Sequence, residues 1–117
     1  MASSGSTALC LPDHMSLGPG EAFIDAHEFC HLHPLPEGDT HVILPPDLQE
    51  ATVRLGWAEP HPAACLGAVP RTLVLLYAPR TRMELDVVFK LISSSYRFAR
   101  GLRCWMAPDL WHCAITA

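Results

Sequence analysis

Four of the seven histidines lie within fifteen residues of the sequence, from His27 to His41. Imidazole exchanges protons near neutral pH and is a common ligand of transition metals, so this stretch is the first candidate for chemistry. Residues 27–33 alternate imperfectly between apolar and polar types, which predicts a β-strand. Because side chains alternate across a strand, His31 and His33 would then lie on one face.

A hairpin is the simplest way to bring a third imidazole to that face. Residues 34–39 contain Pro and Gly in a pattern typical of a turn, and residues 40–44 are predicted to form the returning strand. In the predicted register His33 lies opposite His41, and directly paired residues point to the same side of a sheet. The hairpin therefore predicts that His31, His33 and His41 share one face.

Three neighbouring side chains are placed less directly by this pattern. Phe29 would share the face of the histidines, whereas Glu28 would lie on the other face and could join them only through a bulge. His61 is flanked by Pro60 and Pro62, which fix the backbone and could aim its ring at the hairpin. A histidine that caps the end of a helix is the alternative interpretation of His61.

Imidazoles that share one face can support several roles. Neutral imidazole accepts a substrate proton and imidazolium stabilises negative charge, so one hypothesis is a proton-transfer pocket with the catalytic residues His31, His33, His41 and His61. Alternatively, a transition metal such as zinc, iron or copper is held by His31, His33 and His41. A third interpretation is structural, because half-buried strand histidines also hydrogen-bond the backbone and fill space.

The first helix that must support this hairpin is predicted by hydrophobic periodicity. Asp47 and Glu50 resemble a capping box, and Gly56 is placed to end the helix that follows. Its predicted buried stripe consists of Leu48, Ala51, Thr52 and Leu55. The proline-rich residues 57–71 are expected to form an ordered loop.

A buried strand and a long helix are predicted in the second half of the chain. The continuous apolar run over 72–77 predicts a central strand that is buried on both faces. Thr81 and Glu84 predict the start of a helix that ends at Gly101. Its predicted buried stripe consists of Leu85, Val88, Phe89, Ile92, Tyr96 and Ala99. Together these elements predict an α+β fold of order β-β-α-β-α, with the helices packed on one face of a small sheet.

Length and composition favour one small domain. In the 117 residues we expect a flexible leader over 1–26, the folded domain over 27–101 and an irregular tail over 102–117. The five cysteines form no CxxC motif, which favours free thiols in a reducing, intracellular and cytoplasmic compartment. A net charge of −4 without a basic cluster argues against nucleic acid as a partner, and no apolar run could span a bilayer. The oligomeric state is not predicted by any of these features.

An ordered set of short motifs runs along the chain. In sequence order its members are Glu28, His31 and His33, then His41, Gly56-Trp57, His61-Pro62, Tyr77-Ala78-Pro79-Arg80, and Glu84 with Val87-Val88. Each motif alone is weak, but their order is more specific. Over about residues 27–100 the chain resembles the luciferase domain shared by the fungal luciferase of bioluminescent mushrooms and its many homologues.

The resemblance implies an oxygen-dependent oxidoreductase that acts on a hydroxypyrone-type small molecule. Fungal luciferase oxidises 3-hydroxyhispidin with molecular oxygen as co-substrate and no other cofactor, and the product peroxide loses carbon dioxide and emits light. The resemblance implies that the substrate is deprotonated by His31, His33, His41 and His61. Expected substrate-binding residues are Glu28, Trp57, Tyr77 and Arg80. The guanidinium of Arg80 suits planar recognition of a carboxylate or enolate, and a surface turn arginine is the equally weighted alternative.

The second hypothesis is a non-catalytic domain derived from the same family. Its histidines would hold a transition metal structurally, through His31, His33 and His41, or would merely pack. The tail would then supply an apolar surface for a partner, formed by Trp105, Met106, Leu110 and Trp111.

Overall fold

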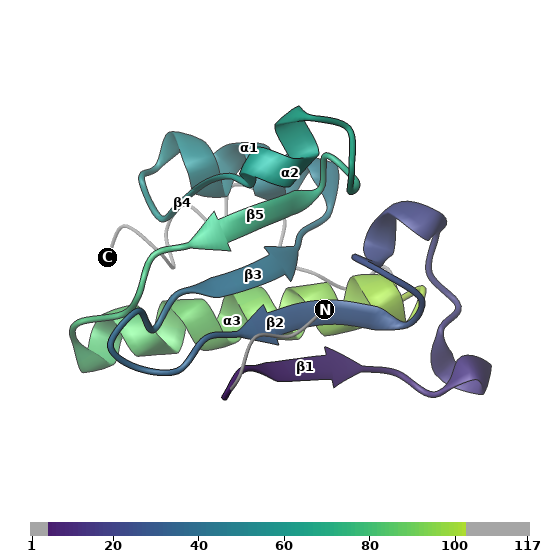
Figure 1. The fold of residues 1–117 in the computed structure, drawn as a ribbon, viewed down its shortest axis with the longest axis horizontal. Helices are drawn as coiled ribbons and strands as arrows, with labels where there is room; N and C mark the ends of the chain where they lie inside the picture. The colour runs from purple at the N-terminus through teal and green to yellow at the C-terminus, as the bar shows by residue number, and fades with distance from the viewer. Residues whose placement is uncertain (1–4, 103–117) are drawn as a thin grey trace.

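A five-stranded antiparallel sheet forms the centre of the computed structural model, which describes residues 5–102 (Figure 1). The strands are β1 (Thr7–Cys10), β2 (Glu28–Leu32), β3 (Thr40–Ile43), β4 (Ala58–Pro60) and β5 (Leu73–Leu76). Their order across the sheet is β1-β2-β3-β5-β4. The apolar strand β5 therefore lies in the interior of the sheet, between β3 and β4, where both of its edges are paired.

The helices are α1 (Pro46–Arg54), α2 (Pro62–Cys65) and α3 (Arg82–Ala99), with short 3₁₀ turns η1 (Asp13–Met15) and η2 (Gly20–Ala22) before β2. The long helix α3 crosses behind the sheet in Figure 1 and contacts β2 and β3. The predicted α+β class is confirmed. The predicted order corresponds to β2-β3-α1-β5-α3, to which the structure adds β1 at the start and β4 and α2 before β5. No helix within the described residues has both the length and the apolar character needed to cross a membrane.

The two faces of the sheet carry different kinds of side chain. One row of paired residues is fully buried and consists of Cys30, Val42 and Val74. The adjacent row consists of His31, His41 and Leu75. Because successive side chains in a strand point to opposite faces, the apolar row faces the helices and the histidine row faces away from them. The alternation within β2 and β3 thus separates the hydrophobic core from the candidate chemistry.

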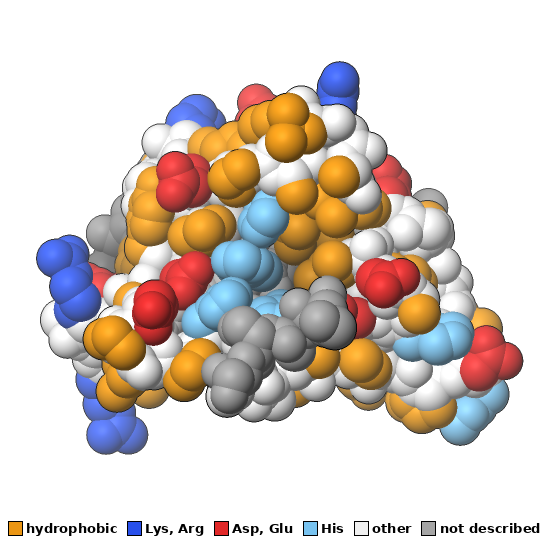
Figure 2. Space-filling model, viewed as in Figure 1, with side chains coloured by type: hydrophobic (Ala, Val, Ile, Leu, Met, Phe, Trp, Pro, Cys, Tyr) orange, Lys and Arg blue, Asp and Glu red, His pale blue; other side chains and the backbone are white. Residues whose placement is uncertain are grey.

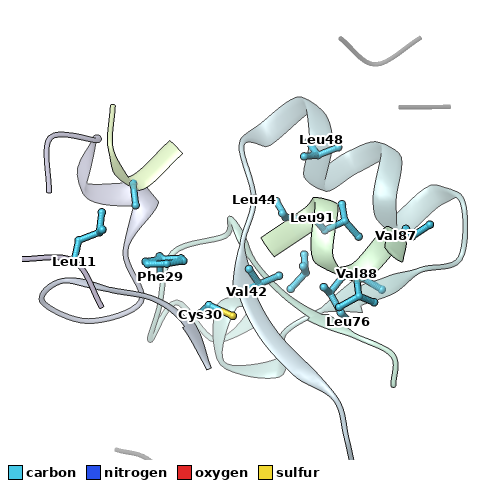
Figure 3. Packing of buried hydrophobic residues seen from close by; sticks show 13 residues of the cluster. Leu11, Phe29, Cys30, Val42, Leu44, Leu48, Leu76, Val87, Val88 and Leu91 are labelled. Atoms are coloured by element: carbon cyan, nitrogen blue, oxygen red, sulfur yellow. The ribbon is translucent and has the colours of Figure 1, made fainter. Parts of the chain in front are cut away.

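The main core fills the space between the sheet and α3. Figure 3 shows Val42 and Leu76 of the sheet beside Val88 and Leu91 of α3. Leu48 of α1 belongs to the same cluster, so α1 and α3 bury their apolar faces against the same side of the sheet. Burying one such side chain stabilises the fold by about 1.5–3 kcal/mol, so this layer holds the histidine face in place from behind.

The long helix α3 begins as predicted but buries a different stripe. The hydroxyl of Thr81 accepts a hydrogen bond from the Glu84 N–H at 3.1 Å, which caps the first turn. The prediction that Leu85 and Phe89 are buried is wrong, because their exposed fractions are 54% and 69%. The observed buried residues are Val87, Val88, Leu91, Ser94, Ser95, Phe98 and Ala99. The stripe includes two serines and an alanine, whose small side chains leave room for close packing on the sheet.

The shorter helix α1 also starts differently from its prediction. Its N-cap residue is Pro45, which makes no side-chain capping bond, so the capping box predicted at Asp47 is wrong. Proline at the start of a helix is tolerated because the first N–H groups lack partners in any case. The glycines predicted to end the two helices, Gly56 and Gly101, have φ values of 87° and 77°. This left-handed conformation is the one in which glycine ends a helix at least cost.

Two segments that were expected to be irregular contain regular structure. In place of the flexible leader expected over 1–26, β1 pairs with β2, and Ala22 of η2 is fully buried beside Ile43. The loop expected over 57–71 contains β4 and α2. These elements span only three or four residues each, which is too short to display a hydrophobic period. The predicted tail lies outside the described residues from 103 onward.

Candidate functional site

The four histidines predicted as catalytic lie together on the face of the sheet that points away from α3. The ring centroid of His33 lies 4.9 Å from that of His31 and 4.5 Å from that of His41. The ring centroids of His61 and His41 are also 4.5 Å apart. Figure 2 shows these side chains as a pale blue row across the middle of this face, with acidic side chains at one end. Rings at these separations can contact a single small ligand.

The register of the hairpin differs from the prediction without changing the face. His31 lies opposite His41, a position that the predicted register assigned to His33. The shift equals two residues along the strand, and the side-chain period of a strand is also two. The predicted face of His31, His33 and His41 is therefore unaffected by the error in register.

A bulge in β2 brings an acidic side chain to the same face. Leu9 pairs with Cys30, and the next residue of β1, Cys10, pairs with Glu28. Phe29 is therefore an extra residue in β2, and it reverses the alternation on its N-terminal side. The expectation that Phe29 lies on the histidine face is wrong, because it is buried in the core against α3. The bulge turns Glu28 to the histidine face, which the prediction allowed only if such a bulge were present.

The carboxylate of Glu28 holds the ring of His31. Glu28 Oε2 lies 2.9 Å from His31 Nδ1, and the two side chains are only 18% and 12% exposed. A carboxylate on Nδ1 fixes the orientation of the imidazole and leaves Nε2 as the nitrogen free to meet a ligand. Glu28, which was predicted to bind substrate, is thus engaged with a histidine of the site.

The ring of His61 is positioned by the start of α2. His61 is the N-cap of this helix, and its Nδ1 accepts a hydrogen bond from the Ala63 N–H at 3.0 Å. This arrangement matches the capping alternative. It also leaves Nε2 of His61 available. The same residue therefore caps a helix and places its ring beside that of His41.

A cavity of about 210 Å³ lies at this cluster. Its lining residues are the four histidines, His31, His33, His41 and His61, together with Ile24, Val69 and Leu73. Ligand pockets commonly combine apolar walls with a few converging polar groups. The cavity has this composition, with imidazoles as its polar groups.

Burial and mutual proximity alter the acidity of two of these rings. Burial lowers the pKa of His41, and the neighbouring His61 and His33 lower it further, although Asp39 opposes them. Burial also lowers the pKa of His61, again partly opposed by Asp39. Both rings are therefore expected to be neutral at pH 7, the form in which imidazole accepts a proton or binds a metal.

Asp39 is a residue of this cluster that the sequence interpretation missed. Its Oδ2 lies 3.3 Å from His41 Nε2, and the two side chains are 21% and 22% exposed. Asp39 and His41 are two positions apart at the start of β3, so they point to the same face. That spacing is the signal that could have identified Asp39, but its place in the predicted turn made a turn-forming role the simpler interpretation.

The comparison with known families agrees with the order of motifs. A family model described as the luciferase domain matches residues 26–95, which is more than half of the chain. The chain belongs to the luciferase domain family. A search of curated proteins and a search of solved structures each found no match to it. The match contains Glu28, Asp39 and the four pocket histidines, so the whole cluster lies within the luciferase domain.

The other residues expected to bind substrate line a separate cavity of this luciferase domain. Trp57, Tyr77 and Arg80 border a space of about 740 Å³ between the end of α1, the end of β5 and the start of α3. None of the described histidines lines it. The side chain of Arg80 is 86% exposed, and its Nε lies 3.8 Å from Glu84 Oε1. This position fits the surface-turn alternative for Arg80, and the structure does not bring these three residues into the histidine pocket.

Proposed function

We propose that this luciferase-domain protein catalyses the oxygen-dependent oxidation of a small hydroxylated, hydroxypyrone-type molecule in the histidine pocket. The observation that carries the proposal is the convergence of four imidazoles from three parts of the chain on one cavity. Membership of the luciferase domain family supports this class of chemistry. The proposal assigns proton transfer and anion stabilisation to His31, His33, His41 and His61.

The size of the cavity favours a particular mode of binding. Its volume of about 210 Å³ is below the range of about 300 Å³ and more that is typical for pockets enclosing a drug-sized ligand. We therefore place only the hydroxylated ring of the substrate among the imidazoles, with the remainder outside. The apolar side chains of Ile24, Val69 and Leu73 would contact the flat ring, while the imidazoles meet its oxygens.

In the proposed reaction an unprotonated imidazole accepts the proton of the substrate hydroxyl. The resulting enolate is electron-rich and transfers electrons to molecular oxygen, which is the oxidant and co-substrate. A carbon–oxygen bond forms, and both oxygen atoms enter the organic peroxide. Breakdown of that peroxide would release carbon dioxide. The pocket supplies the base and holds the anion, so the reaction as proposed requires no organic cofactor.

The test is oxygen uptake by the purified protein supplied with 3-hydroxyhispidin, with light emission recorded at the same time. The double variant His31→Ala/His33→Ala removes two rings of the pocket. A matched control is His14→Ala, which removes an exposed histidine of η1 outside the cavity. We expect uptake by the parent protein and by the control, and loss of uptake in the double variant.

Each alternative outcome has a distinct meaning. Equal uptake by all three proteins would overturn the assignment of the site to the histidines. A folded parent protein without uptake would reject this substrate, and binding of other hydroxypyrones would then be measured by calorimetry. Uptake without light would identify an oxygenase of this family that does not emit light.

A further inference from the structure

Three side chains of the hairpin form a compact group of metal-binding type. His33 follows β2, Asp39 precedes β3, and His41 lies within β3. One potential ligand atom from each of them lies within 4.8 Å of the other two. The His33 N–H donates a hydrogen bond to the Asp39 carbonyl at 3.0 Å, so the backbone fixes the two ends of the turn that carries them.

One nitrogen in this group lacks a partner. His33 Nε2 is buried and has no hydrogen-bond partner among residues 5–102. A buried polar atom without a partner is costly, and such an atom often marks a place where an ion or water belongs. The ring of His33 is in contact with that of His41, whose Nε2 in turn meets Asp39. The ring that carries the unpaired nitrogen therefore borders two further side chains of metal-binding type.

We propose that His33, Asp39 and His41 bind a divalent transition-metal ion of the Zn²⁺ class. Two imidazole nitrogens and one carboxylate oxygen suit such ions, whereas Ca²⁺ and Mg²⁺ prefer an environment composed of oxygen atoms. Three protein ligands leave a coordination position open in a tetrahedral site. His61, whose Nε2 is not used by its capping bond, lies beside His41 with the two ring centroids 4.5 Å apart.

The separations require only a small adjustment on binding. Ligands bound at about 2.0–2.1 Å in a tetrahedral site lie about 3.4 Å from one another. The pair formed by His41 Nε2 and Asp39 Oδ2 is already 3.3 Å apart, and the largest separation in the group is within 4.8 Å. One separation therefore already fits a tetrahedral site, and the others exceed that spacing by about 1.4 Å at most.

This ligand set differs from the three histidines of the sequence-based hypothesis. Asp39 takes the place of His31, whose Nδ1 is engaged by Glu28 and which is not a member of the compact group. A bound metal would take one nitrogen each of His33 and His41, whereas in the metal-free protein all four histidines remain available for the proposed proton transfer. The inference does not rest on the proposed oxidation, because metal binding is measured without substrate or oxygen.

The test is calorimetric titration of the chelator-treated full chain with Zn²⁺, together with the absorption spectrum of its Co²⁺ complex. The near-isosteric variant Asp39→Asn removes the carboxylate, and His33→Ala removes the unpaired ring. The matched control is His31→Ala, which removes a pocket histidine that is not a member of the compact group. We expect one site in the parent protein, binding weakened by about tenfold or more in both ligand variants, and unchanged binding in the control.

Folding of each variant is checked by circular dichroism, and either folded ligand variant suffices for the comparison. A Co²⁺ spectrum with a thiolate charge-transfer band would assign the ion to cysteine and overturn the proposal. The absence of Zn²⁺ binding, equal binding in the parent and both ligand variants, or an equal loss in His31→Ala would also overturn it. If the oxidation assay fails while metal binding is intact, the proposed function is rejected and the metal-site proposal stands.

Discussion

The substitution Gly18→Ala is predicted to destabilise the protein, although Gly18 lies in the stretch that the sequence marks as a flexible leader. The Gly18 N–H donates a hydrogen bond to the Ala99 carbonyl at 2.9 Å, which joins this stretch to the end of α3. An added Cβ would lie 2.2 Å from the Phe98 carbonyl oxygen and 2.9 Å from that of Ala99. Both neighbours are backbone atoms, so they cannot rotate away as the end of a side chain could.

The expected magnitude follows from two contributions. Overpacking of this kind costs about 1–3 kcal/mol, and loss of the hydrogen bond to Ala99 costs about 1 kcal/mol more. We therefore expect the free energy of unfolding to fall by about 2–4 kcal/mol. That is a large part of the roughly 5–15 kcal/mol by which small domains are stable.

The control is Gly20→Ala, two residues along the chain. An added Cβ at Gly20 meets no atom within 4 Å, so the free energy of unfolding should change by less than about 0.5 kcal/mol or rise slightly. Urea unfolding followed by circular dichroism at a helical wavelength measures both variants. If the two alanines have the same small effect, the stretch around Gly18 does not pack on the end of α3 and the reasoning is wrong.

Three further predictions concern the core, a helix cap and a thiol. Leu91→Ala, at a fully buried position, should lower the free energy of unfolding by about 2–5 kcal/mol, whereas Leu85→Ala, at an exposed position of the same helix, should change it by less than about 0.5 kcal/mol. Thr81→Ala should cost about 0.5–2 kcal/mol through loss of the cap, measured by the same urea unfolding. Burial raises the pKa of Cys30 to about 12, so iodoacetamide at pH 8 should label Cys65 well before Cys30 in peptide mass spectra.

Each of these predictions has a clear contrary result. Equal costs at the two leucines would mean that Leu85 is buried as deeply as Leu91, which contradicts the observed face of α3. An unchanged stability in Thr81→Ala would show that the first turn of α3 does not depend on its cap. Labelling of both thiols at one rate would mean that Cys30 is accessible and at least partly ionised, since only the thiolate reacts and a raised pKa reduces its fraction at pH 8.

The sequence was sufficient for the strands and helices with a clear period or an end signal. The hairpin of β2 and β3, the apolar strand β5, and the helices α1 and α3 were all predicted, with glycines at the helix ends. The buried face of α3 was not predicted correctly, because Leu85 and Phe89 are apolar and fit the same helical period as the buried residues. The buried stripe includes Ser94 and Ser95, whose small side chains suit close packing of the helix on the sheet but carry no hydrophobic signal.

The site was predictable where it depends on the alternation of side chains between the two faces of a strand. An error of two residues in register left the three hairpin histidines on their predicted face. The bulge at Phe29 could not be predicted, because it arises from the pairing of β2 with β1, and β1 carries no recognisable pattern. Glu28 was therefore assigned to the wrong face. Asp39 was missed because turn formation explained its presence.

The alternation of β3 has a consequence for how this protein could change over time or by design. Thr40 and Val42 serve the folded state, while His41 between them serves the pocket. Neighbouring residues of the strand therefore have separable roles: one set maintains the fold, and the other can contact a ligand. A library restricted to positions 31, 33, 39, 41 and 61 could exchange the donor atoms of the pocket while the layer behind it stays the same. The pocket is thus suited to changes in ligand preference that leave the fold unchanged.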